Sequence, residues 1–273
     1  MTAQKLSSHE ARDTSRLSPE LLNKQQIAAS RCTVTTDSDS PQMGECAQGG
    51  AQLFIDAAQA HWHLALLGRD ERDVHIRAIP HKGKRGFAIN GNFAMDLERF
   101  QDLNNQGYGI YLQPNIGGTK AKDITLCTAL FWEHDDRPRS EQVELWQSTV
   151  GLQPTVQIDT GGKSIHNYLV LDTPIAPEPW TLLMERLQTA VTGCDKSCKG
   201  NNRMMRMAGS HYINRNGESQ GQVQIINANG PRYSAEELDA VLPPLPAAPQ
   251  SRRKKYSTDS APGLLQIADA LEC

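Results

Sequence analysis

The sequence has few aromatic residues and no long apolar run, and each shortage excludes a class of protein. Aromatic side chains make up 5% of the 273 residues and hydrophobic side chains 38%, so a core is affordable in one large domain or two small ones. No apolar run approaches the roughly 20 residues of a membrane-spanning helix. The N-terminus also lacks an apolar signal core. We therefore expect a soluble, cytoplasmic protein with no membrane partner.

Cysteines are also few, and their spacing is not typical of a metal or disulfide framework. Of the six, Cys194 and Cys198 form the only close pair, and no second pair follows at the spacing of a zinc site. A structural zinc is therefore not expected, and the cysteines are expected to be reduced.

The net charge of −3 by itself gives no attraction to nucleic acid, but basic residues are unevenly distributed. Residues 194–215 contain five Lys or Arg side chains and a single acid, Asp195, and residues 252–255 are all basic. A local basic surface binds phosphates even on an acidic protein.

Composition divides the chain into three parts. Residues 1–48 are rich in Ser, Thr, Gln and Asp and are predicted to be a disordered arm. Residues 49–242 alternate strand-like and helix-like segments, with an antiparallel hairpin predicted at 155–171, which favours the α+β class. Residues 243–273 form a Pro-rich and basic tail.

An apolar run at residues 124–132 ends abruptly in acids. If the strand continues, Glu133 and Asp135 project from the same face, because strand side chains alternate. Two carboxylates in this arrangement suit Mg²⁺ or Mn²⁺, and two such ions can bridge a triphosphate and an attacking 3′-hydroxyl. The alternative is a polar strand end whose acids are solvated.

A second segment follows about thirty residues later, where a Gly161-Gly162 turn opens into another apolar run. Ser164 and His166 share one face there, and with Lys163 they are fitting donors to triphosphate oxygens. Glycines let a backbone approach closely. An ordinary hairpin with a core histidine explains this segment alone, but the two segments together predict a catalytic site with His166 as a member.

Three further residues complete the predicted site. Asp195 is the candidate for a third metal-binding carboxylate, or else a turn residue after a helix. Arg206 is favoured over Arg203 for phosphate, because two strand residues three apart face opposite ways and Gly209 follows closely. Arg77 is a candidate for nucleotide or template phosphates. The alternative for each arginine is a solvated basic surface.

These motifs resemble the archaeo-eukaryotic primase superfamily and are most similar to the RepB-like primase domains of plasmids, phages and cyanobacterial replication proteins. The resemblance covers roughly residues 50–240. The matching segments are 129–136, 157–166 and 203–210, supported by 77–80 and 107–115.

The resemblance implies an RNA-recognition-like catalytic sheet packed on an N-terminal α/β unit. It implies a DNA primase-polymerase that makes primers on single-stranded DNA from nucleoside triphosphates with two Mg²⁺ or Mn²⁺ ions. By the same resemblance Glu133 and Asp135 bind metal, Ser164 and His166 contact the triphosphate, and a third motif supplies an acid, which we place at Asp195.

The family usually begins its first motif with Asp, whereas this chain has Glu133, so a role for Asp136 stays open. Family members often precede a helicase, so a replicative helicase is a candidate partner; the sequence contains none, which fits a stand-alone enzyme or a fragment. Two other functions stay open. One is a catalytically silent nucleic-acid-binding module. The other is a rolling-circle nickase, suggested by His61-Trp-His63, although i and i+2 side chains of a helix point apart.

Overall fold

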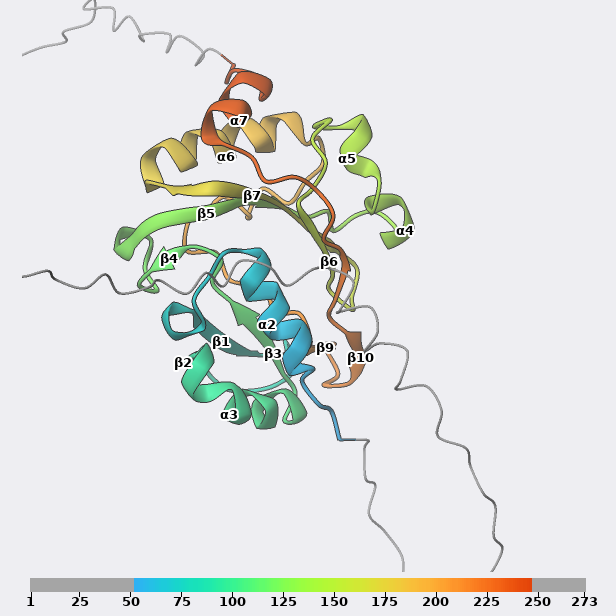
Figure 1. Cartoon of the computed structure of the whole chain (residues 1–273). Helices are drawn as coiled ribbons and strands as arrows, with labels where there is room; N and C mark the ends of the chain where they lie inside the picture. The colour runs from blue at the N-terminus through green and yellow to red at the C-terminus, as the bar shows by residue number, and fades with distance from the viewer. Residues whose placement is uncertain (1–51, 247–273) are drawn as a thin grey trace, which may run out of the picture. The chain divides into compact units, whose positions relative to one another are not determined.

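The computed structural model describes residues 52–246, so the predicted arm and most of the predicted tail lie outside the described residues. Within that range, helices alternate along the chain with the strands of two main antiparallel sheets and of a small two-stranded one, as the α+β prediction requires (Figure 1). None of the helices in this range is long and apolar enough to cross a membrane.

A four-stranded sheet has the order β2-β1-β3-β8, and its first three strands come from the N-terminal half of the described range. Its strands are β2 (Ile89–Asn92), β1 (His75–Pro80), β3 (Tyr108–Leu112) and β8 (Met205–Arg206). Helix α3 (Phe93–Asn105) packs on one face, where a side chain at Gly91 would collide with the ring of Phe100. The sequence of residues 74–80 alternates as in a half-buried strand, and the structure agrees, because Ile76 and Ala78 are fully buried while their neighbours in the strand are half-buried.

A five-stranded sheet has the order β11-β6-β7-β5-β4. Its strands are β11 (Gln224–Asn227), β6 (Val156–Asp159), β7 (Ile165–Ile175), β5 (Ile124–Trp132) and β4 (Ile116–Gly117). The predicted central strand at 124–132 and the predicted hairpin at 155–171 are both present. Strand β5 is buried almost throughout, which explains its nearly unbroken apolar sequence.

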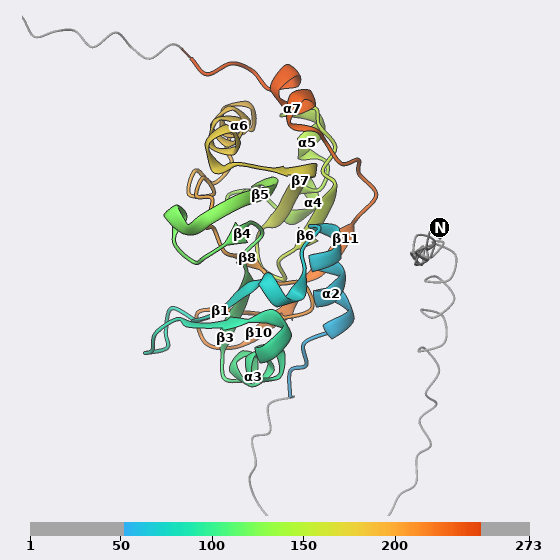
Figure 2. The same ribbon diagram turned by 60° about the vertical axis from the view of Figure 1, so that its left-hand side comes forward.

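Helices cover the five-stranded sheet on the side away from the four-stranded sheet. Figures 1 and 2 show α6 (Pro177–Ala190) and α7 (Ala235–Val241) there. The indole Nε1 of Trp180 donates to the carbonyl of Ala129 over 2.8 Å, which ties α6 to β5. Ser234 caps the N-terminus of α7 and forms with Glu237 the capping box that the sequence predicts.

The remaining elements are short. They are α2 (Ala57–Leu66), α4 (Arg139–Gln142), α5 (Leu145–Ser148), β9 (His211–Ile213), β10 (Ser219–Gln222), and the 3₁₀ helices at Glu71–Asp73 and Ala121–Asp123. The sequence predicts one helix over 140–149, but the structure has two single turns, α4 and α5. The side chain of Gln142 explains the break, because it is buried and bonded to the hairpin instead of lying on a continuous helix face.

Gly209 serves a different purpose from the one its sequence position indicates. We expected it to let the backbone approach a phosphate. Instead its φ is +85°, and a side-chain Cβ there would lie 2.1 Å from the carbonyl oxygen of Asp56. The backbone N–H of Asp56 donates to the carbonyl of Gly209 over 2.9 Å. The glycine therefore joins the start of α2 to the segment after β8.

We predict that Gly209→Ala destabilises the protein by about 3 kcal/mol, because it combines left-handed strain with a backbone collision. Thermal unfolding should show a Tm about 6–12 °C lower. Gly151→Ala is the matched control: its φ is +69°, but nothing lies within 4 Å of the added carbon. It should cost about 1 kcal/mol. Equal losses in the two variants would contradict the role assigned to Gly209.

Candidate active site

The register of β5 and β7 brings the two predicted segments together. Trp132 pairs with Asn167 in an antiparallel register, so beyond this pair Glu133 comes opposite His166 and Asp135 opposite Ser164. His166 Nε2 lies 3.2 Å from Glu133 Oε2. Two residues further along each segment, the Ser164 hydroxyl donates to Asp135 Oδ1 over 2.6 Å. The predicted shared face of all four side chains is therefore present, although both acids lie just past the end of the strand.

The turn between β6 and β7 is fixed by its own side chains. Asp159 Oδ1 accepts from the backbone N–H of Gly161, whose φ is +69°, and the Thr160 hydroxyl donates to the carbonyl of Ser164. Gly162 lies against an aromatic ring, because an added Cβ would stand 2.6 Å from the ring of Tyr212. These glycines allow close packing within the protein, whereas the sequence had suggested close approach to a ligand.

Asp195 reaches the site through a loop after α6. Its backbone N–H donates to the carbonyl of Glu133 over 2.8 Å, which fixes the loop to the end of β5. Its carboxylate accepts from the backbone N–H and the hydroxyl of Ser197. Arg203 Nη2 lies 3.6 Å from Asp195 Oδ2 and 3.3 Å from Glu133 Oε1, so one guanidinium bridges the two acids.

Glu133 is the most constrained acid of the group, with a side chain only 11% exposed. Burial opposes its charged form, but His166, the Cys198 thiol and Arg203 favour it more strongly, and together they hold the pKa of Glu133 well below its usual range. Asp135 differs, because it is half exposed and Lys163 Nζ lies 3.0 Å from its Oδ2. The two carboxylates predicted as one clamp therefore have different surroundings.

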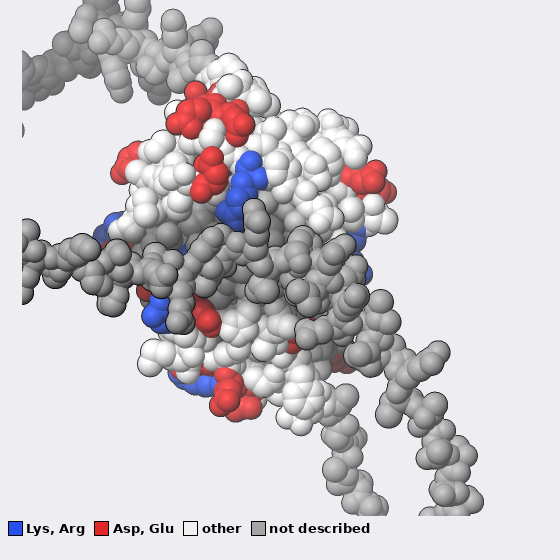
Figure 3. Space-filling view, viewed as in Figure 1, with Lys and Arg blue, Asp and Glu red and all other residues white. Residues whose placement is uncertain are grey.

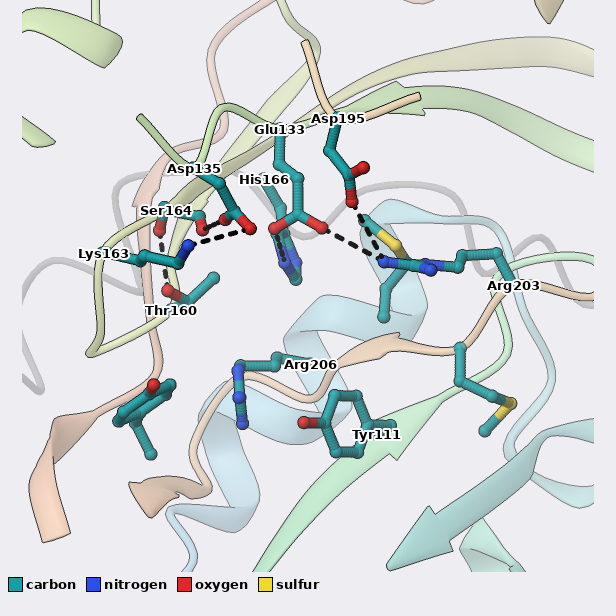
Figure 4. Close-up of a pocket in the computed structure, with 13 residues that line it drawn as sticks. Tyr111, Glu133, Asp135, Thr160, Lys163, Ser164, His166, Asp195, Arg203 and Arg206 are labelled. Carbon is teal, nitrogen blue, oxygen red and sulfur yellow. Dashed lines mark hydrogen bonds and ion pairs between the residues drawn. The ribbon is translucent and has the colours of Figure 1, made fainter. Parts of the chain in front are cut away.

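These side chains line one cavity of about 190 Å³ between the two sheets (Figure 4). Its lining residues are Tyr111, Glu133, Asp135, Thr160, Lys163, Ser164, His166, Asp195, Arg203, Met204, Met205, Arg206 and Tyr212.

Arg206 projects from β8 across the cavity from the acids, as Figure 4 shows. Its guanidinium lies 4.8 Å from the ring centre of Tyr111 and 4.3 Å from that of Tyr212. The expectation that only one of the two arginines reaches the site is wrong. Arg203 lies in the loop before β8, so strand alternation does not govern its direction, and both side chains line the cavity.

Arg77 is the one predicted site residue that lies outside the cavity lining. It pairs with Tyr111, and Tyr111 pairs with Arg206, so the three side chains lie in one row on the same face of the four-stranded sheet. Two strand spacings, about 10 Å, separate Arg77 from Arg206. Its Nε donates to Asn90 Oδ1 over 2.7 Å.

The donor set fits a divalent cation. Among the described residues, Glu133, Asp195 and Cys198 each place a ligand atom within 4.8 Å of the others. Asp135 is not in that group, although the sequence predicts it there; its oxygens lie against Ser164 and Lys163. The bridging guanidinium also indicates a position where positive charge is favoured. Sequence reasoning missed Cys198, which it considered only as half of a zinc pair.

Comparison with known proteins places this site in context. No family model matches the sequence, and no curated protein sequence matches it. Among solved structures, the AEP domain of the cyanophage S-2L primase-polymerase matches with 34% identity, a TM-score of 0.63, and coverage of 69% of this chain and 98% of that one. This chain belongs to the archaeo-eukaryotic primase-polymerase family.

More distantly related solved structures share the fold of this primase-polymerase chain. The catalytic domain of primase RepB′ in complex with initiator DNA matches with 13% identity and a TM-score of 0.50, covering 67% of this chain and 92% of that one. Primase RepB′ matches with 14% identity and a TM-score of 0.52, covering 67% and 61%. The sequence-based assignment to the family and its α+β fold are confirmed.

Beneath the primase-polymerase site lies a buried histidine on α2. His63 is fully buried, its ring meets that of Tyr168 edge-on at 5.7 Å, and its Nδ1 accepts from the backbone N–H of Ala208. Burial, and then the charge of His166, lower the pKa of His63 to about 3. His61 points elsewhere, toward Glu71 at the surface, so the two histidines of the His-Trp-His segment diverge.

We predict that folding stability falls as the pH drops from 7 to 5. The unfolded chain takes up a proton at His63 near pH 6.5, whereas the folded protein takes it up only near 3, so protonation favours unfolding between these values. The loss at pH 5 is about 2 kcal/mol. Urea unfolding at both pH values measures it. His63→Asn, which keeps an acceptor for Ala208, should be less stable at pH 7 but lose about 2 kcal/mol less over this range. An identical loss in both proteins would contradict the assignment.

Proposed function

We propose that this primase-polymerase synthesises primers on single-stranded DNA from nucleoside triphosphates by template-directed nucleotidyl transfer. The observation that carries the proposal is one cavity with carboxylates along one wall and phosphate-binding donors on the others. The DNA in the RepB′ complex supports a nucleic-acid template for this chain as well.

Glu133 and Asp195 would hold one divalent ion, and Asp135 would share a second with Glu133, which lies between them in Figure 4. The proposed cofactors are two Mg²⁺ or Mn²⁺ ions. When bound, such ions neutralise the triphosphate and favour deprotonation of an attacking 3′-hydroxyl. Every other contribution comes from side chains of the chain itself.

His166 contacts the Glu133 carboxylate instead of solvent, because its ring is buried and its Nε2 faces that carboxylate. It would keep Glu133 charged and hold its oxygens in place. Ser164 and Lys163 now bond Asp135. With the charge of that carboxylate neutralised, the hydroxyl and the ammonium would be available to donate to the triphosphate.

Arg206 would bind the triphosphate from the opposite wall. The rings of Tyr111 and Tyr212 fix the plane of its guanidinium, so less rotational freedom is lost when it binds phosphate. The row that continues from Arg206 through Tyr111 to Arg77 offers a path for the template strand, with one aromatic ring and two cations. By contrast, acidic side chains gather over α6 and α7 on the face in Figure 3. Template binding on that part of the surface is disfavoured.

The two other functions have weaker support. A nickase of the His-hydrophobic-His type needs both histidines at one metal, but His61 is at the surface and His63 is in the core. A silent binding module would gain nothing from two carboxylates held together, since they repel phosphate in the absence of a cation. A replicative helicase as partner stays a prediction.

Primer synthesis tests the proposal directly. We expect Glu133→Gln and Asp195→Asn to lower the rate of dinucleotide synthesis on single-stranded DNA by about 10³-fold or more, because each removes charge that neutralises the cations. Asp136→Asn is the matched control. Asp136 is exposed and does not line the cavity, so this variant should stay within about threefold of the wild type. Wild-type synthesis by the Glu133 variant would overturn the proposal.

Two arginine variants separate nucleotide from template binding. Arg206→Lys should raise the KM for nucleoside triphosphate by about tenfold or more, because lysine cannot reproduce the stacked, planar donor group. Arg77→Ala should leave this KM within about twofold and should weaken binding of single-stranded DNA, with a shallower dependence of affinity on salt. Steady-state kinetics and fluorescence anisotropy measure the two effects. If Arg77→Ala raises the nucleotide KM as much as Arg206→Lys, the row does not separate the two ligands.

A further inference from the structure

A sulfur atom lies among the carboxylates of the site. Cys198 is fully buried, and its Sγ is 3.4 Å from Glu133 Oε1 and 4.0 Å from Asp195 Oδ2. The loop that positions Asp195 also positions this thiol, because the backbone N–H of Cys198 donates to the carbonyl of Asp195 over 3.2 Å. The three side chains thus offer two oxygens and one sulfur to a single point.

Two observations beside these ligands favour a cation at that point. The Arg203 guanidinium already lies between Glu133 and Asp195. Among the described residues, three buried polar atoms of neighbouring side chains have no hydrogen-bond partner: Nε of Arg203, Nδ1 of His166, which lines the same cavity, and the hydroxyl of Tyr168, whose ring centre lies 6.4 Å from that of His166. A cation with its water shell would offer partners to such atoms.

Because the ligand set combines carboxylate oxygens with a sulfur atom, it affects which cation binds most tightly. Mg²⁺ prefers oxygen ligands in octahedral geometry and gives up its water reluctantly. Thiolate ligands favour softer ions such as Zn²⁺ and Cd²⁺. An all-oxygen site favours these ions over Mg²⁺ less strongly, whereas one sulfur ligand adds a bond that Mg²⁺ does not form well.

We propose that Cys198 is a sulfur ligand of the cation site formed with Glu133 and Asp195, and that this site binds Zn²⁺ or Cd²⁺ more tightly than Mg²⁺. The inference rests on the proposed function, in which the two acids hold a divalent ion. On binding, the thiol proton goes to solvent and a metal–sulfur bond forms, with no change of oxidation state. Thiophilic ions then compete with Mg²⁺ for the site and inhibit synthesis.

Cadmium titration of the metal-free full chain tests this inference without any enzymatic activity. A Cd²⁺–thiolate bond produces a charge-transfer absorption in the ultraviolet, and calorimetry gives the Kd. We expect the wild type to gain the absorption as one equivalent binds. Cys198→Ser should lose it and bind Cd²⁺ at least about tenfold more weakly. Cys194→Ser is the matched control: Cys194 is buried on the same loop, but its thiol contacts the carbonyl of Gln188 and the ammonium of Lys196 instead of the carboxylates, so this variant should behave as the wild type.

A second variant keeps the test decisive if Cys198→Ser fails to fold. Glu133→Gln retains the thiol but loses one carboxylate, so it should keep the absorption per bound ion and bind Cd²⁺ at least about tenfold more weakly. Wild-type Cd²⁺ affinity in Glu133→Gln, or an undiminished absorption in folded Cys198→Ser, would place the sulfur ligand elsewhere and overturn the inference.

The experiments distinguish failure of the sulfur-ligand inference from failure of the proposed catalytic function. If Cys198→Ser binds Cd²⁺ as the wild type does while primer synthesis still requires Glu133, only the sulfur ligand is wrong. If the absorption depends on Cys198 but Glu133→Gln synthesises primers normally, the cation site stands and the proposed catalytic function fails.

Discussion

One nearly buried carboxylate, Glu133, is the constraint on which the site depends. A charge at the end of a buried strand is costly unless partners surround it, and this one has an imidazole, a guanidinium and a thiol within 3.4 Å. The partners come from separate parts of the chain: His166 from β7, and Arg203 and Cys198 from the segment after α6. Keeping Glu133 charged therefore requires these segments to fold together, and site formation is coupled to formation of the sheet.

The antiparallel pairing of β5 and β7 determines which side chains of the two strands meet at the site. A register slip of one residue would turn the side chain of Ser164 or His166 to the opposite face, away from the acids. The slip is opposed by the buried aromatic and aliphatic residues of both strands and by Gln142, whose amide holds the turn at Lys163 and Ile165. The four-stranded sheet then contributes Arg206 and Tyr111 from the opposite side, so the cavity requires both sheets.

Strand periodicity explains why much of the site could be predicted from sequence. Glu133, Asp135, Ser164 and His166 follow from two apolar runs and the alternation of side chains, and no loop geometry is needed. Cys198, Arg203 and Tyr212 could not be found in this way, because a loop or a short strand carries each of them and no periodic pattern gives its direction. The roles that the sequence suggests for the glycines are wrong for a related reason. Its tolerance of close contact was assigned to a ligand, but at Gly209 and Gly162 the close neighbour is the protein itself.

The Arg203 guanidinium between Glu133 and Asp195 has a consequence for how the site is loaded. Under the proposed function, a divalent ion that binds there would replace one positive charge by another, so its measured affinity would contain the free energy of releasing the arginine. The released arginine would be attracted to the triphosphate. Each ligand would then raise the affinity for the other by the same factor, and ion and nucleotide would be thermodynamically linked through a single side chain.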